Sequence, residues 1–309
     1  MQPLFYQIPL FLVESILPSK TSSTHPHIPF KIVPLFITQP PTFILQHPHA
    51  LLAIIISKAF PQNIKNLENI RHIMTSGQKS QVIGNFFDSR WNAYRDFLNL
   101  DLLNHKKLFQ QLATHIQNNL PKDYAFLDLA CGDCEPAGNL LKLHPAKSYV
   151  GVDIAAEVLK LSFLNLKHFH GQKTLIPLDF TLYLEQPGES FDLILLSYSL
   201  HHLKTEDKKR CIENARKKLN PGGFLAIIDG MRLNDQSRED WLNLCYNYME
   251  NKSQGQCPES CKIVRAHMIE ADIPEEGREY VRMATEAGFS RTELSLEEAS
   301  GLGVLFAHA

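Results

Sequence analysis

The chain has 309 residues, of which 44% are apolar, and its formal net charge at pH 7 is −2. This length and composition allow one full hydrophobic core with additions to it. The charge near zero excludes an overall basic surface. The longest apolar run of the N-terminal segment, Ala50–Ile56, is too short to cross a bilayer.

Residues 1–73 differ in composition from the rest of the chain. They contain no glycine and ten of the 18 prolines, which interrupt every apolar stretch. Three interpretations compete: a targeting leader, an added domain, or a segment upstream of a natural start at Met74. The segment lacks the basic start and compact apolar core of a leader, and prolines without glycine make a poor domain. We favour the third interpretation and expect residues 1–73 to be disordered or to precede the functional protein.

The next segment, residues 80–120, has the apolar spacing of two helices. The apolar positions that share a face are Trp91, Tyr94, Phe97 and Leu98 in the first helix and Leu108, Leu112 and Ile116 in the second. Packing in a core explains Phe97 and Leu98. The rings of Trp91 and Tyr94 combine an apolar body with a polar atom, which suits the mouth of a binding pocket as well as a core.

A strand–turn–helix–strand pattern follows at residues 126–153. An apolar run ends in a turn of small residues, Ala130-Cys131-Gly132-Asp133-Cys134-Glu135, and a second apolar run ends in Asp153. Such a unit holds a nucleoside, because the turn brings backbone N–H groups to the ligand and the acid accepts hydrogen bonds from ribose hydroxyls. Asp133 and Glu135 would repel a pyrophosphate. A positively charged ligand without phosphate, such as S-adenosylmethionine, fits this turn better.

Strand-like runs alternate with helical stretches through the rest of the chain. The runs lie at 125–130, 148–153, 174–178, 192–197 and 223–229, and they are bounded by Gly, Pro, Asn and Asp. This alternation predicts an α/β fold with a parallel sheet covered on both faces. At the end of the chain, residues 289–296 and 302–307 follow each other without a helix between them, which predicts an antiparallel hairpin at the sheet.

These motifs, in this order, resemble those of class I S-adenosylmethionine-dependent methyltransferases, from about Phe126 to the C-terminus. Within that family the chain is similar to a little-characterised small-molecule-type group. The resemblance implies a Rossmann-like seven-stranded sheet, mostly parallel with a C-terminal antiparallel hairpin, helices on both faces, and S-adenosylmethionine as cofactor. Alanine and cysteine stand in two glycine positions of the family's first motif. The cofactor-binding residues that the resemblance implies are Asp128, Ala130, Gly132, Cys134, Asp153, Ile154, Asp179, Phe180 and Ser197.

The resemblance also divides residues 74–309 into parts. These are a helical cap at 80–120, a cofactor core at 121–232, an acceptor-side insertion at 233–274, and a C-terminal helix and hairpin at 275–309. Because the insertion follows a strand whose C-terminal end faces the cofactor, it should roof the acceptor site. The substrate-binding candidates are Trp91, Tyr94, Arg232, Trp241 and His267, and the catalytic candidates are Tyr198, His201 and His202. The two adjacent histidines come just after the fourth strand, where a general base would be needed.

The six cysteines include the pairs Cys131/Cys134 and Cys257/Cys261, but the first pair belongs to the cofactor turn, so we expect no metal site. The basic clusters lie on one predicted helix face, which favours a small-molecule acceptor over nucleic acid. The predicted function is S-adenosylmethionine-dependent methyl transfer to a small molecule in the cytoplasm, without a membrane partner. The alternatives are a methyltransferase acting on tRNA or protein and a protein that binds the cofactor without turnover. The sequence leaves the oligomeric state open.

Overall fold

The computed structural model describes residues 95–309. The predictions for residues 1–73, for the part of the cap before residue 95, and for Trp91 and Tyr94 therefore lie outside the described residues. The described part begins with a helical segment at 95–99, after which α4 runs over His105–Asn119. The buried side chains of α4 include Leu108, Leu112 and Ile116, which is the face that the spacing predicts.

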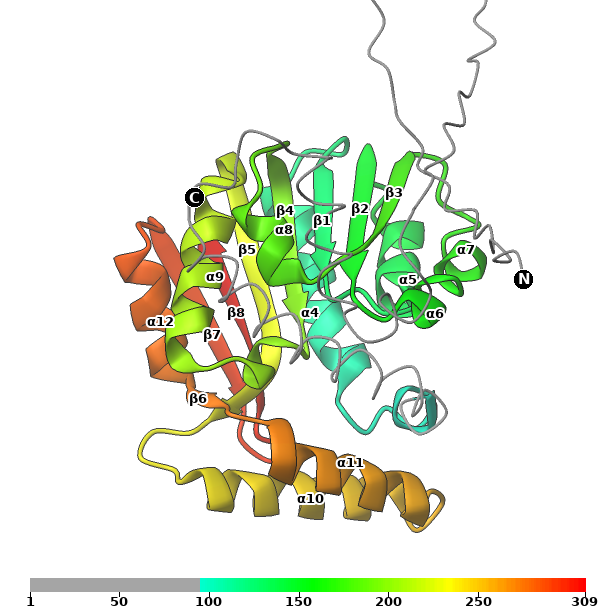
Figure 1. The fold of residues 1–309 in the computed structure, drawn as a ribbon, viewed down its shortest axis with the longest axis vertical. Helices are drawn as coiled ribbons and strands as arrows, with labels where there is room; N and C mark the ends of the chain where they lie inside the picture. The colour runs from blue at the N-terminus through cyan, green and yellow to red at the C-terminus, as the bar shows by residue number, and fades with distance from the viewer. Residues whose placement is uncertain (1–94) are drawn as a thin grey trace, which may run out of the picture. The chain divides into compact units, whose positions relative to one another are not determined.

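An eight-stranded sheet forms the centre of the described chain (Figure 1). Its main path has the order β3-β2-β1-β4-β5-β8-β7, and the two-residue β6 pairs with β5 off this path. The strands are β1 Ala125–Leu129, β2 Ser148–Asp153, β3 Gln172–Pro177, β4 Phe191–Ser197, β5 Leu219–Arg232, β6 Glu275–Glu276, β7 Arg291–Glu297 and β8 Leu302–His308. Strands β1 to β5 pair in parallel, and β8 is antiparallel to both β5 and β7. The predicted sheet is thus confirmed, with β6 as an additional short strand.

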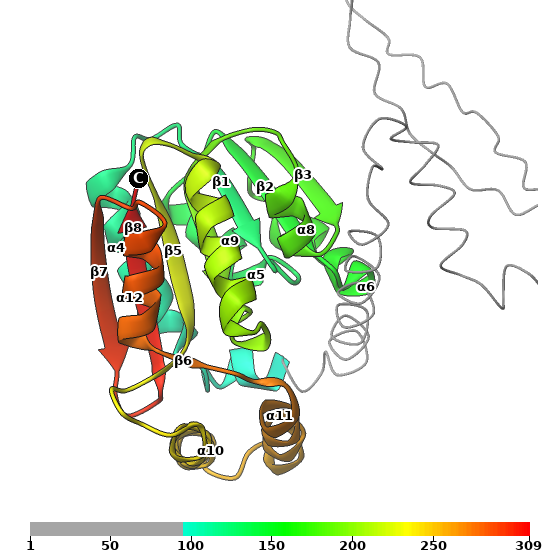
Figure 2. The same cartoon turned by 60° about the vertical axis from the view of Figure 1, so that its left-hand side comes forward.

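Helices cover both faces of the sheet because its central strands are apolar on both sides. In β5, Phe224 and Ala226 belong to the core under α4 and α5, whereas Leu225 and Ile227 belong to the core under α8, α9 and α12 (Figure 2). The helices on these two faces are α5 Glu135–Leu143, α6 Ala156–Leu159, α7 Ser162–Asn165, α8 Phe180–Glu185, α9 Thr205–Lys217 and α12 Gly277–Glu286. This alternation follows from the two-residue period of a strand.

Strand β5 is longer than the run predicted at 223–229. Leu219 already pairs with Phe191, and the register then shifts so that Leu193 pairs with Phe224. The Asn-Pro-Gly-Gly sequence that predicts a turn before this strand therefore lies in an irregular stretch within it. A proline is tolerated there because a bulge does not need its missing N–H group.

The predicted insertion at 233–274 folds as two helices, α10 Arg238–Ser253 and α11 Pro258–Ala271. Figure 1 shows them side by side beyond the end of the sheet to which β5 leads. Since β1 to β4 run parallel to β5, this is the end at which the carboxyl termini of the parallel strands lie. A third apolar cluster joins the two helices to Phe97 and Leu102. Within residues 95–309, helices long and apolar enough to cross a membrane are absent.

Candidate active site

The turn after β1 has a left-handed backbone at three alternate positions. The angle φ is +57° at Ala130, +54° at Gly132 and +59° at Cys134. Glycine adopts this conformation without a steric penalty, whereas a residue with a Cβ atom is strained by roughly 1 kcal/mol. The glycine positions of the family motif therefore reflect a backbone requirement, which this chain meets with alanine and cysteine at two of the three positions.

Cys134 was predicted to contact the cofactor, but the structure places its side chain elsewhere. The side chain is fully buried, and it does not line the cleft that lies at the carboxyl ends of β1 to β4. Its Sγ atom lies 3.2 Å from the hydroxyl of Tyr149 on β2. Cys134 therefore packs the turn against β2 instead of facing the cleft.

A cleft of about 1100 Å³, including the solvent at its mouth, lies at the carboxyl ends of β1, β2, β3 and β4. Apart from Cys134, every predicted cofactor residue lines it, namely Asp128, Ala130, Gly132, Asp153, Ile154, Asp179, Phe180 and Ser197. Further residues line the cleft that were not predicted to contact the cofactor, namely His105, Phe109, Cys131, Asp133, Pro136, Ala137, Ala155, Val158, Ser199 and Leu203. His105 could have been found, because it precedes the buried Leu108 and Leu112 at helical spacing.

Asp128 is the deepest carboxyl group of the cleft. The Tyr149 hydroxyl donates to its Oδ2 atom at 2.8 Å, and Oδ1 is buried without a hydrogen-bond partner among the described residues. Burial raises the pKa of Asp128 to about 7. A buried carboxyl oxygen without a partner is costly unless a ligand supplies a donor or a positive charge. The ammonium or sulfonium group of S-adenosylmethionine would supply that charge, so the cleft fits this cofactor.

Asp153 and Asp179 hold the two neighbouring loops of the cleft. Asp153 accepts hydrogen bonds from the backbone N–H of Gly132 and of Ala155, both at 2.7 Å. Asp179 accepts from the backbone N–H of Thr181 at 2.8 Å and so caps α8. Each acid follows a strand of the sheet, so both lie at the edge where ligands of open α/β sheets bind. They are the residues that would hold the ribose and the adenine.

A second cavity adjoins this cleft. It measures about 850 Å³, including the solvent at its mouth, and Tyr198 and His202 line both spaces. Its apolar wall comes from the segment before α4, from α10 and from α11, and includes Phe97, Leu102, Leu103, Trp241, Met249, Ile263, Val264 and Met268. The insertion thus covers a cavity next to the cofactor cleft, which is where the acceptor site was expected.

The imidazoles and the carboxyl group that line this cavity gather at one place. Nδ1 of His201 is hydrogen-bonded to Asp229 Oδ1, and the backbone N–H of His201 donates to Asp229 Oδ2 at 3.0 Å. Asp272 Oδ1 lies 3.7 Å from Nε2 of His201 and 3.3 Å from Nδ1 of His202. The ring of His267 lies 5.1 Å from that of His202. Two carboxyl groups and three imidazoles therefore share one buried corner.

The three histidines differ in charge. Burial lowers the pKa of His201, but Asp229 and Asp272 more than reverse this and raise it to about 9. The pKa of His202 is lowered by burial and by the charge of His201, and burial lowers the pKa of His267 to about 4. At neutral pH the corner therefore contains one imidazolium, His201, beside two neutral imidazoles.

The remaining predicted residues lie in different places. The Tyr198 hydroxyl donates to the backbone oxygen of Leu103 at 2.6 Å, so Tyr198 forms the wall between cleft and cavity. Trp241 forms another wall, with its indole N–H donating to Gly301 at 2.8 Å. Arg232 was predicted to bind the acceptor but lines neither space. Its guanidinium donates to the backbone oxygens of Pro274 and Gln236, because β5 ends at Arg232 and the side chain ties the two ends of the insertion together.

Comparison with known proteins gives one family match. Residues 127–225 match the family model described as a methyltransferase domain. These residues contain the end of β1, the turn after it, β2 to β4 and the first half of β5. Among curated proteins, none matches the sequence.

Solved structures with the same fold include several methyltransferases. Magnesium protoporphyrin IX methyltransferase from Synechocystis, with bound SAH, is 14% identical; the match covers 74% of this chain and 98% of that chain with a TM-score of 0.52. A putative O-methyltransferase from Nostoc punctiforme is 19% identical, with 65% and 55% of the two chains covered and a TM-score of 0.48. An O-methyltransferase family 2 protein from Planctomyces limnophilus in complex with apigenin is 18% identical, with 67% and 62% covered and a TM-score of 0.46.

The match thus spans about half the length of the Nostoc protein and nearly all of the Synechocystis protein. The matched residues form the part of the sheet that carries the cleft, and the strand order with its antiparallel end agrees with this family. Residues 127–225 therefore match a methyltransferase domain, and the described chain shares the fold of magnesium protoporphyrin IX methyltransferase, a structure with bound SAH.

Proposed function

We propose that the enzyme methylates a hydroxyl oxygen of a small, mostly apolar acceptor that binds in the cavity beneath α10 and α11. The observation that carries this proposal is the apolar cavity itself, which meets the cofactor cleft at Tyr198 and His202. Its volume suits a drug-sized molecule. Its three imidazoles and the carboxyl group of Asp272 lie together at one corner, which would orient the polar end of an acceptor with an apolar body.

His201 supports a hydroxyl acceptor at that corner. It lines the cavity and is cationic at neutral pH, since its pKa is raised to about 9. An imidazolium that contacts a hydroxyl favours the anion of that hydroxyl. The carboxyl groups of Asp229 and Asp272 lie against the same ring and offset its charge for groups farther away. His202 is neutral and lies in the wall shared with the cofactor cleft, where it can accept the hydroxyl proton.

The cofactor supplies a methyl group that is activated for attack by its positively charged sulfur. The chain contributes position: Tyr198 and His202 separate the two binding spaces by the width of one side chain. Holding acceptor oxygen and methyl group in line at such a wall accounts for much of the rate in a two-substrate reaction. The apolar residues around the cavity exclude water from the anion.

The test is an activity screen of the full chain with S-adenosylmethionine, in which release of S-adenosylhomocysteine is measured. The panel contains phenols and enols with apolar bodies, amines and thiols of matched shape, tRNA and a protein mixture. We expect turnover with hydroxyl compounds, and a loss of at least tenfold in kcat for His202→Gln with little change in affinity for S-adenosylhomocysteine. Turnover of amines, tRNA or protein alone would refute the proposed acceptor. Cofactor binding without turnover of any member would support a binding protein instead.

A further inference from the structure

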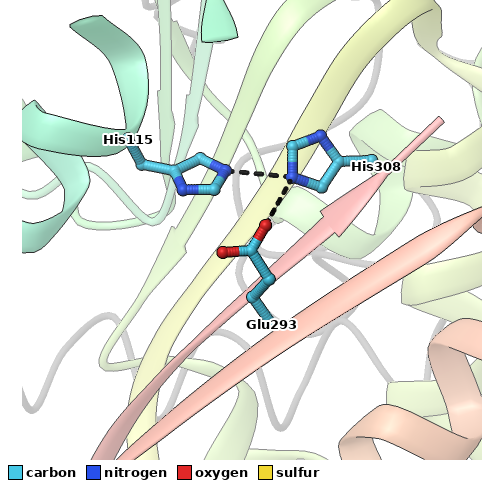
Figure 3. Close-up of side chains that lie close together, drawn as sticks. All are labelled: His115, Glu293 and His308. Carbon is cyan, nitrogen blue, oxygen red and sulfur yellow. Dashed lines mark hydrogen bonds and ion pairs between the residues drawn. The ribbon is translucent and has the colours of Figure 1, made fainter. Parts of the chain in front are cut away.

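A cluster of side chains that can ligate a metal ion lies far from the cofactor cleft. It consists of His115 on α4, Glu293 on β7 and His308 on β8 (Figure 3). His308 pairs with Phe224 towards the beginning of β5, whereas the cofactor cleft lies at the opposite ends of the parallel strands. No step of methyl transfer uses these residues, so the reason for their convergence is a separate question.

The position of each side chain follows from the local structure. Side chains two residues apart on a strand share a face. His308 of β8 and Glu293 of β7 therefore lie on the face covered by α4, together with Phe306. The His115 ring stacks on Phe306 with centroids 3.8 Å apart and an angle of 6°, and it meets the edge of Phe224 at 4.7 Å. These contacts fix the ring and direct its Nε2 atom towards His308.

The nitrogen atoms of this cluster are poorly matched to one another. Nε2 of His115 lies 3.0 Å from Nε2 of His308, and Nη2 of Arg291 lies 2.9 Å from the same His308 atom. A neutral imidazole offers one lone pair, and the guanidinium offers only donors. If His115 donates, two donors share one lone pair; if His308 donates, its N–H group faces an N–H group of Arg291. In either tautomer of His308, one of its two short contacts, with His115 or with Arg291, is not a proper hydrogen bond.

We propose that His115, His308 and Glu293 form a binding site for a divalent transition-metal ion of the zinc type. Two imidazole nitrogens and a carboxylate suit Zn²⁺, Co²⁺ or Ni²⁺. An ion about 2.0–2.1 Å from tetrahedral ligands places the ligand atoms about 3.3 Å apart. The His115–His308 and His308–Glu293 atom pairs are 3.0 Å and 3.6 Å apart, and all three ligand atoms lie within 4.8 Å of one another.

Glu293 is the ligand that would have to move to bind the ion, and its side chain can do so. The Glu293 side chain is 48% exposed, so it can rotate to close its distance to the ion, and water can occupy a fourth position. The ion would join α4 to the C-terminal hairpin across 193 residues of sequence. A link of that kind stabilises the folded state, because the unfolded chain does not hold the three ligands together.

Arg291 distinguishes this proposal from a purely structural cluster. Its guanidinium lies 3.2 Å from Glu293 Oε1 and also next to His308. The positive charge of Arg291 is therefore close to the place where the ion would bind. The Arg291 side chain is 57% exposed and can turn to solvent when an ion binds. Arg291→Gln should therefore tighten metal binding by about tenfold, since one positive charge near the ion is removed.

The experiment is a titration of the full, reduced, chelator-treated chain with Zn²⁺ by calorimetry, repeated with Co²⁺ to record the visible spectrum. We expect one tight site, a Co²⁺ spectrum without the near-ultraviolet band of thiolate ligands, and a rise in melting temperature on the order of 5–10 °C at a hundredfold excess over Kd. His115→Asn and His308→Asn should each weaken binding at least tenfold. His170→Asn, at an exposed histidine outside the cluster, is the matched control and should bind as the wild type.

Several outcomes would overturn the proposal. These are no site tighter in the wild type than in His115→Asn and His308→Asn, a thiolate band in the Co²⁺ spectrum, or weaker binding in Arg291→Gln. If either histidine variant melts abnormally without metal, Glu293→Gln and Arg291→Gln decide the matter at an exposed position. The first must weaken binding and the second must strengthen it.

Discussion

Replacing Asp229 with asparagine removes the carboxylate that keeps His201 charged in the acceptor cavity. Asp229 is completely buried, and its two oxygens meet Nδ1 and the backbone N–H of His201. Burial alone would lower the pKa of His201, but Asp229 and Asp272 raise it to about 9. Asp229→Asn leaves only Asp272 to oppose burial, so the pKa of His201 should fall.

This change has a definite effect on how stability depends on pH. The folded-state pKa of His201 lies above its usual value of 6.5. Its contribution to stability is therefore fully present below pH 6.5 and is lost as the pH rises through 9. The full contribution is roughly 3 kcal/mol, which corresponds to a loss of about 1.4 kcal/mol for each pH unit inside that window. The pKa of Asp128 is about 7, and the pKa values of His105, His115 and His267 are about 4. These four groups therefore titrate mainly below the upper part of the range from pH 6.5 to pH 9.

The assay is urea denaturation of the full chain at pH 7.0 and pH 8.0. The wild type and the control His170→Asn should lose about 1 kcal/mol of unfolding free energy between these pH values, beyond the loss seen for Asp229→Asn. Cysteines that titrate in the unfolded chain affect all three proteins equally, so the comparison removes their effect. Equal pH slopes in the wild type and Asp229→Asn would show that His201 is not held as an imidazolium, and the proposed role of its charge would fall with that result.

Three further predictions concern the two binding spaces. Asp153→Ala should weaken the binding of S-adenosylhomocysteine by ~1–3 kcal/mol, measured by calorimetry, because this acid both lines the cleft and holds the N–H groups of Gly132 and Ala155; unchanged affinity would contradict its placement at the ribose. Cys134→Gly should leave that affinity within about twofold, because Sγ faces Tyr149 and not the cleft; a large gain in binding or activity would show otherwise. Gly230→Ala should raise KM for the acceptor but not Kd for the cofactor product, since its Cβ atom would lie 2.6 Å from Trp241 Cζ2 in the cavity wall; steady-state kinetics would reveal any equal effect on both ligands.

The sequence predicted the fold and most of the cofactor cleft for a common physical reason. Asp128, Asp153 and Asp179 lie within or directly after apolar strands, and parallel strands bring their carboxyl ends to one edge. The residues at that edge could therefore be read from local patterns alone. The predicted hairpin also followed from local patterns, since no helix lies between Arg291–Glu297 and Leu302–His308.

The acceptor corner depended on contacts that local patterns do not encode. Asp229 lies near the end of the buried strand β5 and approaches His201 from 28 residues away, and Asp272 joins them from the end of α11. A pairing between distant loops has no period in the sequence, so only the packing of the insertion on the sheet determines it. Arg232 lies outside the cavity for a related reason. It follows the buried Met231 at the end of β5, and its side chain hydrogen-bonds to the backbone at the ends of the insertion instead of lining the cavity.

The two binding spaces differ in charge in a way that suits one kind of reaction. The cofactor cleft contains Asp153 and Asp179, whereas the cavity beside it contains the imidazolium of His201. In the proposed reaction the cationic methyl donor binds in the first space and the acceptor oxyanion in the second, on either side of Tyr198 and His202. Transfer of a methyl group from a sulfonium to an oxyanion removes both charges, and apolar surroundings favour a reaction in which charge disappears. A neutral amine nucleophile would instead leave a cation in the product, beside His201 and the carboxyl groups of Asp229 and Asp272, so the two acceptor classes leave different net charges in the cavity.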